Sequence, residues 1–278
     1  MRCEWQSFIQ LLPIRLRHEI EAYSASLLEL RLRVGQWPEL IIGTDSHWLD
    51  TVVSADDICY CINAATRYSP WTSGTVADGY MTAFGGHRIG ICGRRVNGTA
   101  SISEITSLCL RVARDFDGIS RELWRLNEPI LIVGQPGCGK TTLLRDLIRR
   151  RSDNSMGCVA VVDEKGEIFP FLQQKACFPI GKRTDILTGF SKSKGIEMLL
   201  RNMCPNTIAV DEITAQEDCD ALIHAGWCGV RLLATAHGES QADLDRRPVY
   251  RRLKESGIFK AVVILMQDRS WRVERMDK

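Results

Sequence analysis

Residues 129–141 read PILIVGQPGCGKT. Residues 130–133 are apolar without polar alternation, which is typical of a strand buried on both faces of a parallel sheet. Residues 134–141 match the pattern G-x-x-x-x-G-K-[ST], and residues 140–151 are expected to form a helix. A buried strand, a glycine-rich loop and a helix in this order predict a phosphate-binding loop in an α/β domain.

The glycine-rich loop has the residue types that binding a nucleoside triphosphate requires. Its glycines let successive backbone N–H groups point at phosphate oxygens, and the following helix adds its positive N-terminal end. We expect Lys140 to reach the β- and γ-phosphates of ATP, and Thr141 to ligate Mg²⁺, which prefers hard oxygen ligands. A glycine-rich turn with an incidental lysine is the alternative. The expected nucleotide-contacting residues are Gly134, Gln135, Pro136, Gly137, Cys138, Gly139, Lys140, Thr141 and Thr142.

A second motif, residues 207–212, reads TIAVDE and delivers two acids at the end of an apolar strand. Open parallel sheets bind ligands beyond the carboxyl ends of their strands, so these acids are expected beside the glycine-rich loop. We expect Asp211 to hold Mg²⁺ through water and Glu212 to act as the general base for the attacking water. An acid pair that caps a helix is the alternative interpretation.

Two more strand ends carry polar residues. Residues 161–167 read VVDEKGE, where Glu164 is the better candidate to orient water or metal, although such acids also cap or solvate turns. Residues 235–238 read TAHG, where His237 is either a sensor of the γ-phosphate or a surface histidine. Phosphoryl transfer also needs cations, often an arginine from a neighbouring subunit. The arginines considered, each with a surface salt bridge as the alternative, are Arg183, Arg201, Arg88 and Arg111.

The character of the sequence changes between residues 115 and 129. We expect a smaller α+β domain over residues 1–115, a linker over 116–128, and an ATPase domain with a mainly parallel sheet over 129–278. Local patterns predict further elements. They are helices over residues 19–32 and 54–68, a strand at 40–42, a hairpin over 79–93, buried strands at 158–162, 207–210 and 230–235, and edge strands at 261–266 and 271–274.

Composition excludes several classes of protein. Hydrophobic residues make up 45% of the 278 residues and the formal net charge is +2, which indicates a folded chain with no charge bias towards nucleic acid. Eleven cysteines without a CxxC pair favour reduced thiols, and we expect the positive potential of the loop to lower the pKa of Cys138. Apolar runs are far shorter than the ~20 residues that span a bilayer. We therefore expect a cytoplasmic chain whose membrane role is peripheral.

Several segments beyond the glycine-rich loop resemble one family. They are LRLRVGQWPEL, the Tyr68-Ser69 region, GYMTAFGGHRIGICGRRV, SLCLRVAR, VVDEKGEI, GKRTDIL, AVDEITAQEDCDAL and ATAHGES. Through them the chain resembles the stage III sporulation AA proteins of endospore-forming bacteria, which are similar to the ATPases of type II and type IV secretion systems. The resemblance nearly covers the chain.

The resemblance implies a RecA-like motor domain behind a smaller N-terminal domain, a hexameric ring, and peripheral docking on the membrane channel between mother cell and forespore, on the mother-cell side. It also places Glu164 in the acidic box and His237 in the histidine box of the secretion ATPases. The second motif differs, because those ATPases usually have glycine where this chain has Asp211.

Three functions follow as hypotheses. The leading one is an ATP-hydrolysing ring motor that energises the channel. The second is a nucleotide-dependent assembly switch with little turnover. The third is a RecA-like nucleic-acid motor, against which the near-neutral charge and the lack of a basic and aromatic stripe both count.

Overall fold

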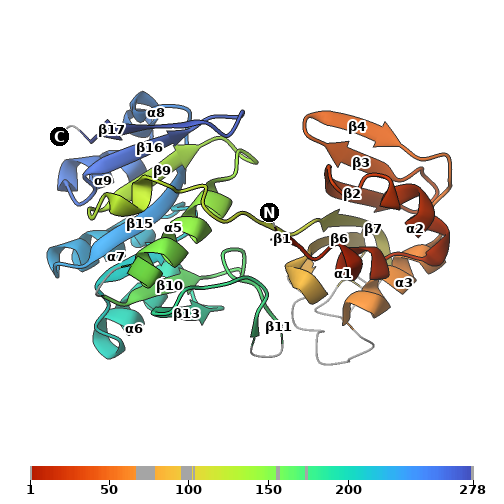
Figure 1. Ribbon diagram of the computed structural model, residues 1–278, viewed down its shortest axis with the longest axis horizontal. Helices are drawn as coiled ribbons and strands as arrows, with labels where there is room; N and C mark the ends of the chain where they lie inside the picture. Colours follow the sequence, from red (N-terminus) through yellow and green to blue (C-terminus); the bar gives the residue numbers. More distant parts are fainter. Residues whose placement is uncertain are drawn as a thin grey trace. The chain divides into compact units, whose positions relative to one another are not determined.

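The computed structural model describes residues 2–66, 79–94, 102, 104–154, 157–172 and 175–276. The chain forms two units (Figure 1). The first comprises Met1–Asp115 and Phe171–Cys177, and the second comprises Phe116–Pro170 and Phe178–Lys278. The segment Phe171–Cys177 therefore belongs to the first unit although it comes from the middle of the ATPase sequence.

The first unit contains a six-stranded antiparallel sheet of order β4-β3-β2-β7-β6-β5. The strands are β2 (Leu27–Arg33), β3 (Glu39–Ile42), β4 (Asp45–Trp48), β5 (Tyr80–Thr82), β6 (Arg88–Arg94) and β7 (Glu104–Arg111). The helices are α1 (Trp5–Gln10), α2 (Ile14–Glu21), α3 (Ala55–Thr66) and the short 3₁₀ helix η2 (Phe84–Gly86). Two short strand pairs also belong to this unit, β1 (Arg2–Cys3) with β8 (Arg114–Asp115) and β11 (Phe171–Leu172) with β12 (Lys175–Ala176).

Several sequence expectations hold in this unit. The strand expected at residues 40–42 is β3, and β5 and β6 form the expected hairpin. Helix α3 starts behind Ser54 as expected, in a reciprocal cap: Ser54 Oγ accepts the N–H of Asp57, and the Asp57 carboxylate accepts the N–H of Ser54. The end of this predicted helix, residues 67–68, lies outside the described residues.

The helix predicted over residues 19–32 is wrong. Helix α2 ends at Glu21, and β2 begins at Leu27. Residues 27–33 read LLELRLR, in which Leu30 and Leu32 are fully buried while Arg31 is exposed. Leucine, glutamate and arginine favour helices, but their alternation with period two suits a strand with one buried face. Pairing of this segment with β3 and β7 in the sheet outweighs the helical preference of its residues.

The second unit is built on a seven-stranded sheet of order β13-β10-β14-β15-β9-β16-β17 (Figure 1). The strands are β9 (Ile130–Gly134), β10 (Val159–Asp163), β13 (Thr184–Thr188), β14 (Thr207–Val210), β15 (Arg231–His237), β16 (Ala261–Leu265) and β17 (Trp271–Arg275). All neighbours run parallel except β16 and β17, so the predicted mainly parallel sheet is confirmed. The segment predicted as an edge strand at 261–266 is instead interior, because β17 covers it, and β16 is fully buried.

Helices cover both faces of this sheet. One core is formed by β-strand residues with residues of α6 (Lys192–Asn202), α7 (Gln216–Trp227), α8 (Gln241–Arg246) and α9 (Pro248–Ser256). Helix α5 (Lys140–Asn154) has no residue in that core and packs on β9, β10, β13 and β15, and the 3₁₀ helix η3 (Leu123–Arg125) packs against it. Burial on both faces explains the nearly continuous apolar sequences of β9, β10 and β14.

The strand register brings four carboxyl ends to one edge. His237 at the end of β15 pairs with Gly134 at the end of β9, and Val210 at the end of β14 pairs with Ala234 and Val162. The residues that follow these strands therefore meet at the same edge. Within the described ranges, no helix has both the length and the apolar character needed to cross a membrane.

A buried histidine in the first unit gives a test of pH-dependent stability. His87 Nδ1 accepts the N–H of Ala113, so Nε2 carries the proton that faces Ser7 Oγ and the Glu4 carbonyl. Burial lowers the pKa of His87 to about 4. Because this value lies below that of an unfolded histidine, the unfolded chain takes up a proton first as the pH falls, and stability declines from about pH 6.5 to pH 4.

We expect urea unfolding to give a free energy of unfolding lower at pH 5 than at pH 7, with about 2 kcal/mol of the difference due to His87. The variant His87→Gln, which cannot titrate, should lose that part of the pH dependence. Equal pH dependence in the two proteins would contradict the assignment.

Candidate nucleotide-binding site

The glycine-rich loop joins the carboxyl end of β9 to α5. Gly137 and Gly139 have φ values of +78° and +104°, a backbone conformation that glycine adopts without strain, and open space lies where each Cβ would be. Gly134 serves a different purpose, because a Cβ there would lie 2.8 Å from the carbonyl oxygen of Leu265. The loop thus closes tightly on β16 at its start and leaves an open backbone cradle at Gly137 and Gly139.

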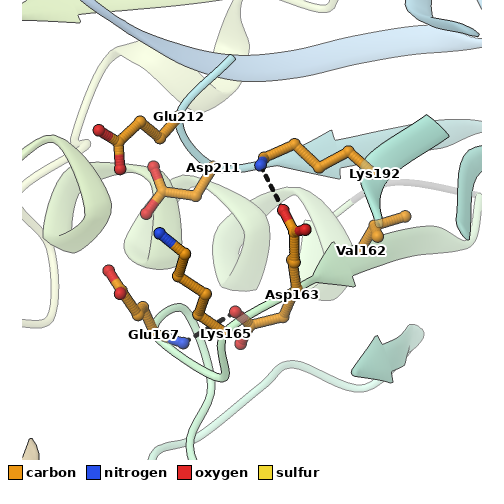
Figure 2. A pocket seen from close by; sticks show the side chains of 8 residues that line it. Val162, Asp163, Lys165, Glu167, Lys192, Asp211 and Glu212 are labelled. Carbon is orange, nitrogen blue, oxygen red and sulfur yellow. Dashed lines mark hydrogen bonds and ion pairs between the residues drawn. The ribbon is translucent and has the colours of Figure 1, made fainter. Parts of the chain in front are cut away.

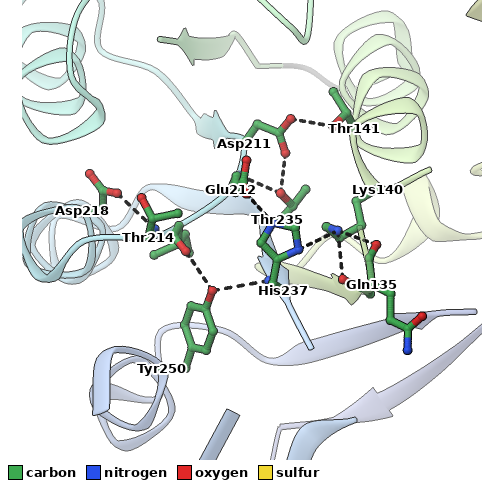
Figure 3. Close-up of polar contacts among 12 residues, drawn as sticks. Gln135, Lys140, Thr141, Asp211, Glu212, Thr214, Asp218, Thr235, His237 and Tyr250 are labelled. Atoms are coloured by element: carbon green, nitrogen blue, oxygen red, sulfur yellow. Dashed lines mark hydrogen bonds and ion pairs between the residues drawn. The ribbon is translucent and has the colours of Figure 1, made fainter. Parts of the chain in front are cut away.

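Lys140 is buried, and its ammonium lies inside this loop. Lys140 Nζ donates to the carbonyl oxygens of Gly134 and Gln135, both at 2.9 Å, and lies 3.2 Å from His237 Nδ1. An ammonium group only donates, so Nδ1 of His237 accepts and its Nε2 carries a proton. That Nε2–H donates to the carboxylate of Glu212. Lysine, histidine and glutamate therefore form one chain of hydrogen bonds (Figure 3).

A second network joins the loop to the acids after β14. Thr141 Oγ1 donates to Asp211 Oδ2 at 2.7 Å. The other oxygen of Asp211 accepts the hydroxyl proton of Thr235, a fully buried residue of β15. Thr235 Oγ1 in turn accepts the backbone N–H of Glu212 at 2.7 Å. Figure 3 shows Asp211 between the two threonines, with both carboxylate oxygens in use.

Glu212 is held in an uncommon conformation. Its φ of +49° lies in the left-handed region, which non-glycine residues adopt at a cost. Burial raises the pKa of Glu212, but the hydrogen bond from His237 and nearby positive charge outweigh it and lower the pKa below the usual value. Behind this pair, Tyr250 OH donates to the carbonyl oxygen of Ile213 at 2.9 Å and faces the N–H of His237. The glutamate is thus kept ionised and is fixed from several sides.

A small pocket opens beside these residues, at the turn that follows β10 (Figure 2). It is lined by Val162, Asp163, Glu164, Lys165, Glu167, Lys192, Asp211 and Glu212. Acids from two neighbouring strand ends therefore share one pocket with two lysines. Lys192 Nζ lies 2.6 Å from Glu164 Oε2, and the positive charge of Lys165 acts on Glu212.

Asp163 and Glu164 have different surroundings although they are adjacent. Asp163 is buried and accepts the backbone N–H groups of Glu167, Ile168 and Phe169 at 2.8–3.0 Å, which closes the turn. Burial raises the pKa of Asp163 to about 6 in spite of these bonds. Glu164 is about one-third exposed and faces the pocket. Asp163 therefore builds the turn, and Glu164, paired with Lys192, is the acid that is presented to the pocket.

The two expected arginines of the second unit, Arg183 and Arg201, do not line the pocket. Arg183 precedes β13, and its carbonyl oxygen accepts the N–H of Val159 at the amino end of β10, the sheet edge opposite the site. Arg201 is in the last turn of α6, a helix whose first residue is at the pocket, and it lies 3.9 Å from Glu197. Arg88 and Arg111 are in the first unit, on β6 and β7. An action of Arg183 or Arg201 on a neighbouring subunit stays a prediction.

The expectation for Cys138 is wrong. The thiol is buried, and burial raises its pKa more than the charge of Lys140 lowers it. The sequence reading also missed three residues of the site. Thr235 stands two positions before His237 on the same strand end, a spacing that places both near the edge of the sheet. Lys192 and Tyr250 have no local signal, because only the packing of α6 and α9 brings them to the site.

The oxygen donors at the loop suit Mg²⁺. Thr141 Oγ1 and Asp211 Oδ2 are hard ligands 2.7 Å apart, and Asp211 lines the pocket. Mg²⁺ takes few protein oxygens and keeps several waters. We expect Thr141 to hold the ion directly and Asp211 to hold it through water. When bound, the ion would polarise phosphate oxygens as a Lewis acid.

The order of the mainly parallel sheet and the glycine-rich loop between β9 and α5 give the second unit the RecA-like fold of the P-loop nucleoside triphosphatases. Solved structures agree with this class. The chain is similar to the ATPase DotB of Legionella pneumophila, with 15% identity, a TM-score of 0.61 and coverage of 96% of this chain and 82% of that one. It is also similar to the pilus retraction motor PilT with bound ADP, with 15% identity, a TM-score of 0.64 and coverage of 95% and 83%. At this identity the likeness shows the fold alone.

Sequence comparison identifies the family. A family model described as "Sporulation stage III, protein AA" matches residues 4–274. Stage III sporulation protein AA of Bacillus subtilis (strain 168) is 36% identical over 247 residues, which cover 83% of this chain and 80% of that protein. The chain belongs to the sporulation stage III protein AA family, which confirms the resemblance seen in its motifs.

The double role of Thr235 gives a test of the network. The variant Thr235→Val keeps the shape of the side chain but leaves Asp211 and the N–H of Glu212 each short of a partner. We expect it to lower the free energy of unfolding by about 1–3 kcal/mol, the cost of buried polar groups without partners. The control Thr235→Ser keeps the hydroxyl and should cost less. If urea unfolding shows equal losses, the hydroxyl does not hold the network.

Proposed function

We propose that the chain binds ATP with Mg²⁺ and hydrolyses it, as a secretion-type motor ATPase in endospore formation. The observation that carries the proposal is the hydrogen bond of 2.7 Å between Thr141 and Asp211. It brings the hydroxyl of the glycine-rich loop and the carboxylate of the second motif to one point, where a metal-bound triphosphate needs both. Family membership supports the process, and the RecA-like fold supports the class of machine.

Each residue has a proposed task. Lys140 exchanges its two loop carbonyls for the β- and γ-phosphate oxygens, whose charge it offsets. Glu212, kept ionised by its partners, accepts a proton from the attacking water, and Glu164 orients that water or the metal from the other side of the pocket. His237 is hydrogen-bonded to both Lys140 and Glu212. A movement of the lysine towards phosphate would therefore change the hydrogen bonding of the general base Glu212 through the imidazole of His237.

The proposal extends to assembly and place. We propose a hexameric ring, cytoplasmic and peripheral to the membrane on the mother-cell side, which docks on the channel complex between mother cell and forespore and energises it. In such a ring Arg183 or Arg201 would supply positive charge to the nucleotide of a neighbouring subunit. Their positions away from the pocket of their own chain support an action between subunits.

Two substitutions separate binding from turnover. ATP·Mg²⁺ at about 100 times its Kd should stabilise the wild type by about 2.7 kcal/mol, seen as a rise in Tm. Lys140→Ala should lose this rise and lose phosphate release. Glu212→Gln should keep the rise while phosphate release falls by about 10²–10⁴-fold, because the general base is absent.

The matched control is Lys182→Ala, which removes an exposed lysine outside the pocket and should behave as the wild type. Sporulation that proceeds normally with Glu212→Gln would favour the assembly switch over the motor. Equal phosphate release by wild type and Lys140→Ala would contradict the proposed site.

Assembly can be tested by size measurement with and without ATP·Mg²⁺. We expect the wild type to form rings whose population rises with nucleotide, because the proposed trans-acting arginines bind the nucleotide of a neighbouring subunit. Lys140→Ala should show no such rise, because it does not bind the nucleotide. A monomer that turns over ATP at full rate would contradict the ring.

The nucleic-acid motor has its own test. Strong stimulation of ATP hydrolysis by single-stranded DNA, weakening as the salt concentration rises, would favour it.

A further inference from the structure

Lys192 is a buried cation at the edge of the candidate site. It is the first residue of α6, and its side chain is only 10% exposed. Its ammonium lies 2.6 Å from Glu164 Oε2 and 3.9 Å from Asp218 Oδ2. Asp218 also accepts the N–H groups of Thr214 and Ala215, so it already serves as the cap of α7. The ammonium therefore has Glu164 as its close partner.

This position is unfavourable for a lysine on local grounds. The first turn of a helix is the positive end of its dipole, where anions stabilise and cations destabilise. Burial of an ammonium group adds a cost that only a close anion offsets. Sequences depart from such local preferences mainly at functional sites. The ion pair with Glu164 is the contact that accounts for a lysine here.

Close packing of α6 on β10 makes the ion pair possible. Gly195 lies one turn after Lys192, and a Cβ at that position would come 2.5 Å from Cγ1 of Val162, a residue that lines the pocket. Glycine inside a helix costs roughly 0.5–1 kcal/mol relative to alanine. The absence of a side chain there lets the first turn of α6 lie against the strand that ends at Asp163, within reach of Glu164.

Glu164 needs this support, because little else fixes it. Its neighbour Asp163 is held by three backbone N–H groups, whereas Glu164 is about one-third exposed and projects into the pocket. A carboxylate on a flexible side chain contributes to catalysis only when its geometry is fixed. The ammonium of Lys192 donates to Oε2 of Glu164 at 2.6 Å, and Glu164 lines the pocket.

We propose that Lys192 is a positioning residue for ATP hydrolysis, which fixes Glu164 in the pocket and acts through it. The inference rests on the proposed function, because it concerns the turnover of ATP at the same site. Lys192 acts through Glu164 and does not itself contact the nucleotide. Its removal therefore affects the rate of the chemical step and leaves the affinity for ATP in place.

The variant Lys192→Met keeps the apolar stem of the side chain and removes the charge. We expect kcat to fall about 10–100-fold, the loss typical of residues that orient a ligand group, while the Kd for a fluorescent ATP analogue with Mg²⁺ changes by less than about 3-fold. The control Lys194→Met removes an exposed lysine of the same helical turn and should leave both values unchanged. Melting temperatures of all variants report any general loss of stability.

A double-mutant cycle separates positioning from mere structure. In the Glu164→Gln background, Lys192→Met should cause almost no further loss of kcat, because its partner is already neutral. Radiolabelled ATP measures the residual rates in each variant. The proposal is overturned if Lys192→Met keeps the wild-type kcat with a lower melting temperature, or if its fold-loss is the same in both backgrounds.

The experiments distinguish a failure of the proposed ATPase function from a failure of the positioning role of Lys192. If the wild type binds no ATP or releases no phosphate, the proposed function falls and the role of Lys192 falls with it. If the wild type turns over ATP normally and the lysine variants do not affect kcat, only the positioning role is lost.

Discussion

The hydrogen bond between Thr141 and Asp211 depends on one constraint, the common edge at which the parallel strands end. Thr141 belongs to the helix after β9, and Asp211 follows β14, which lies two strands away in the sheet. Thr235, on the strand between them, bonds Asp211 from the other side. A shift of one residue in any of these strands would turn the side chains to the opposite face and remove the contact. The buried apolar strands therefore fix the chemistry as well as the core.

Around this contact, Thr235 and His237 each bond two other residues of the site. Thr235 is both donor to Asp211 and acceptor for the N–H of Glu212, and His237 lies between Lys140 and Glu212. Such networks stabilise the site only when all members are present. The left-handed backbone of Glu212 is held by these same partners, which means that local strain and hydrogen bonding are balanced at the residue proposed as the base.

The sequence could predict what depends on local order. The glycine-rich loop, the buried strands and the acids that follow them are consecutive in the chain, and parallel sheets bring such ends together. The roles of Lys192 and Tyr250 could not be predicted from the sequence, because these residues approach the site only through the packing of α6 and α9. The pKa of Cys138 depends on burial, which no motif reports. Residues 27–32 were wrongly predicted as part of a helix because leucine, glutamate and arginine favour helices, although their alternation with period two is typical of a strand with one buried face.

The segment Phe171–Cys177 gives the chain an interlaced connectivity. The backbone passes from the first unit to the second after Asp115, returns at Phe171 and leaves again after Cys177. Its return begins just after the turn that Asp163 closes beside the pocket. Separation of the units by a cut after Asp115 would therefore leave the first without its short β11–β12 pair and the second with that pair deprived of its neighbours. Each unit is thus assembled from two stretches of the chain that are not consecutive in sequence.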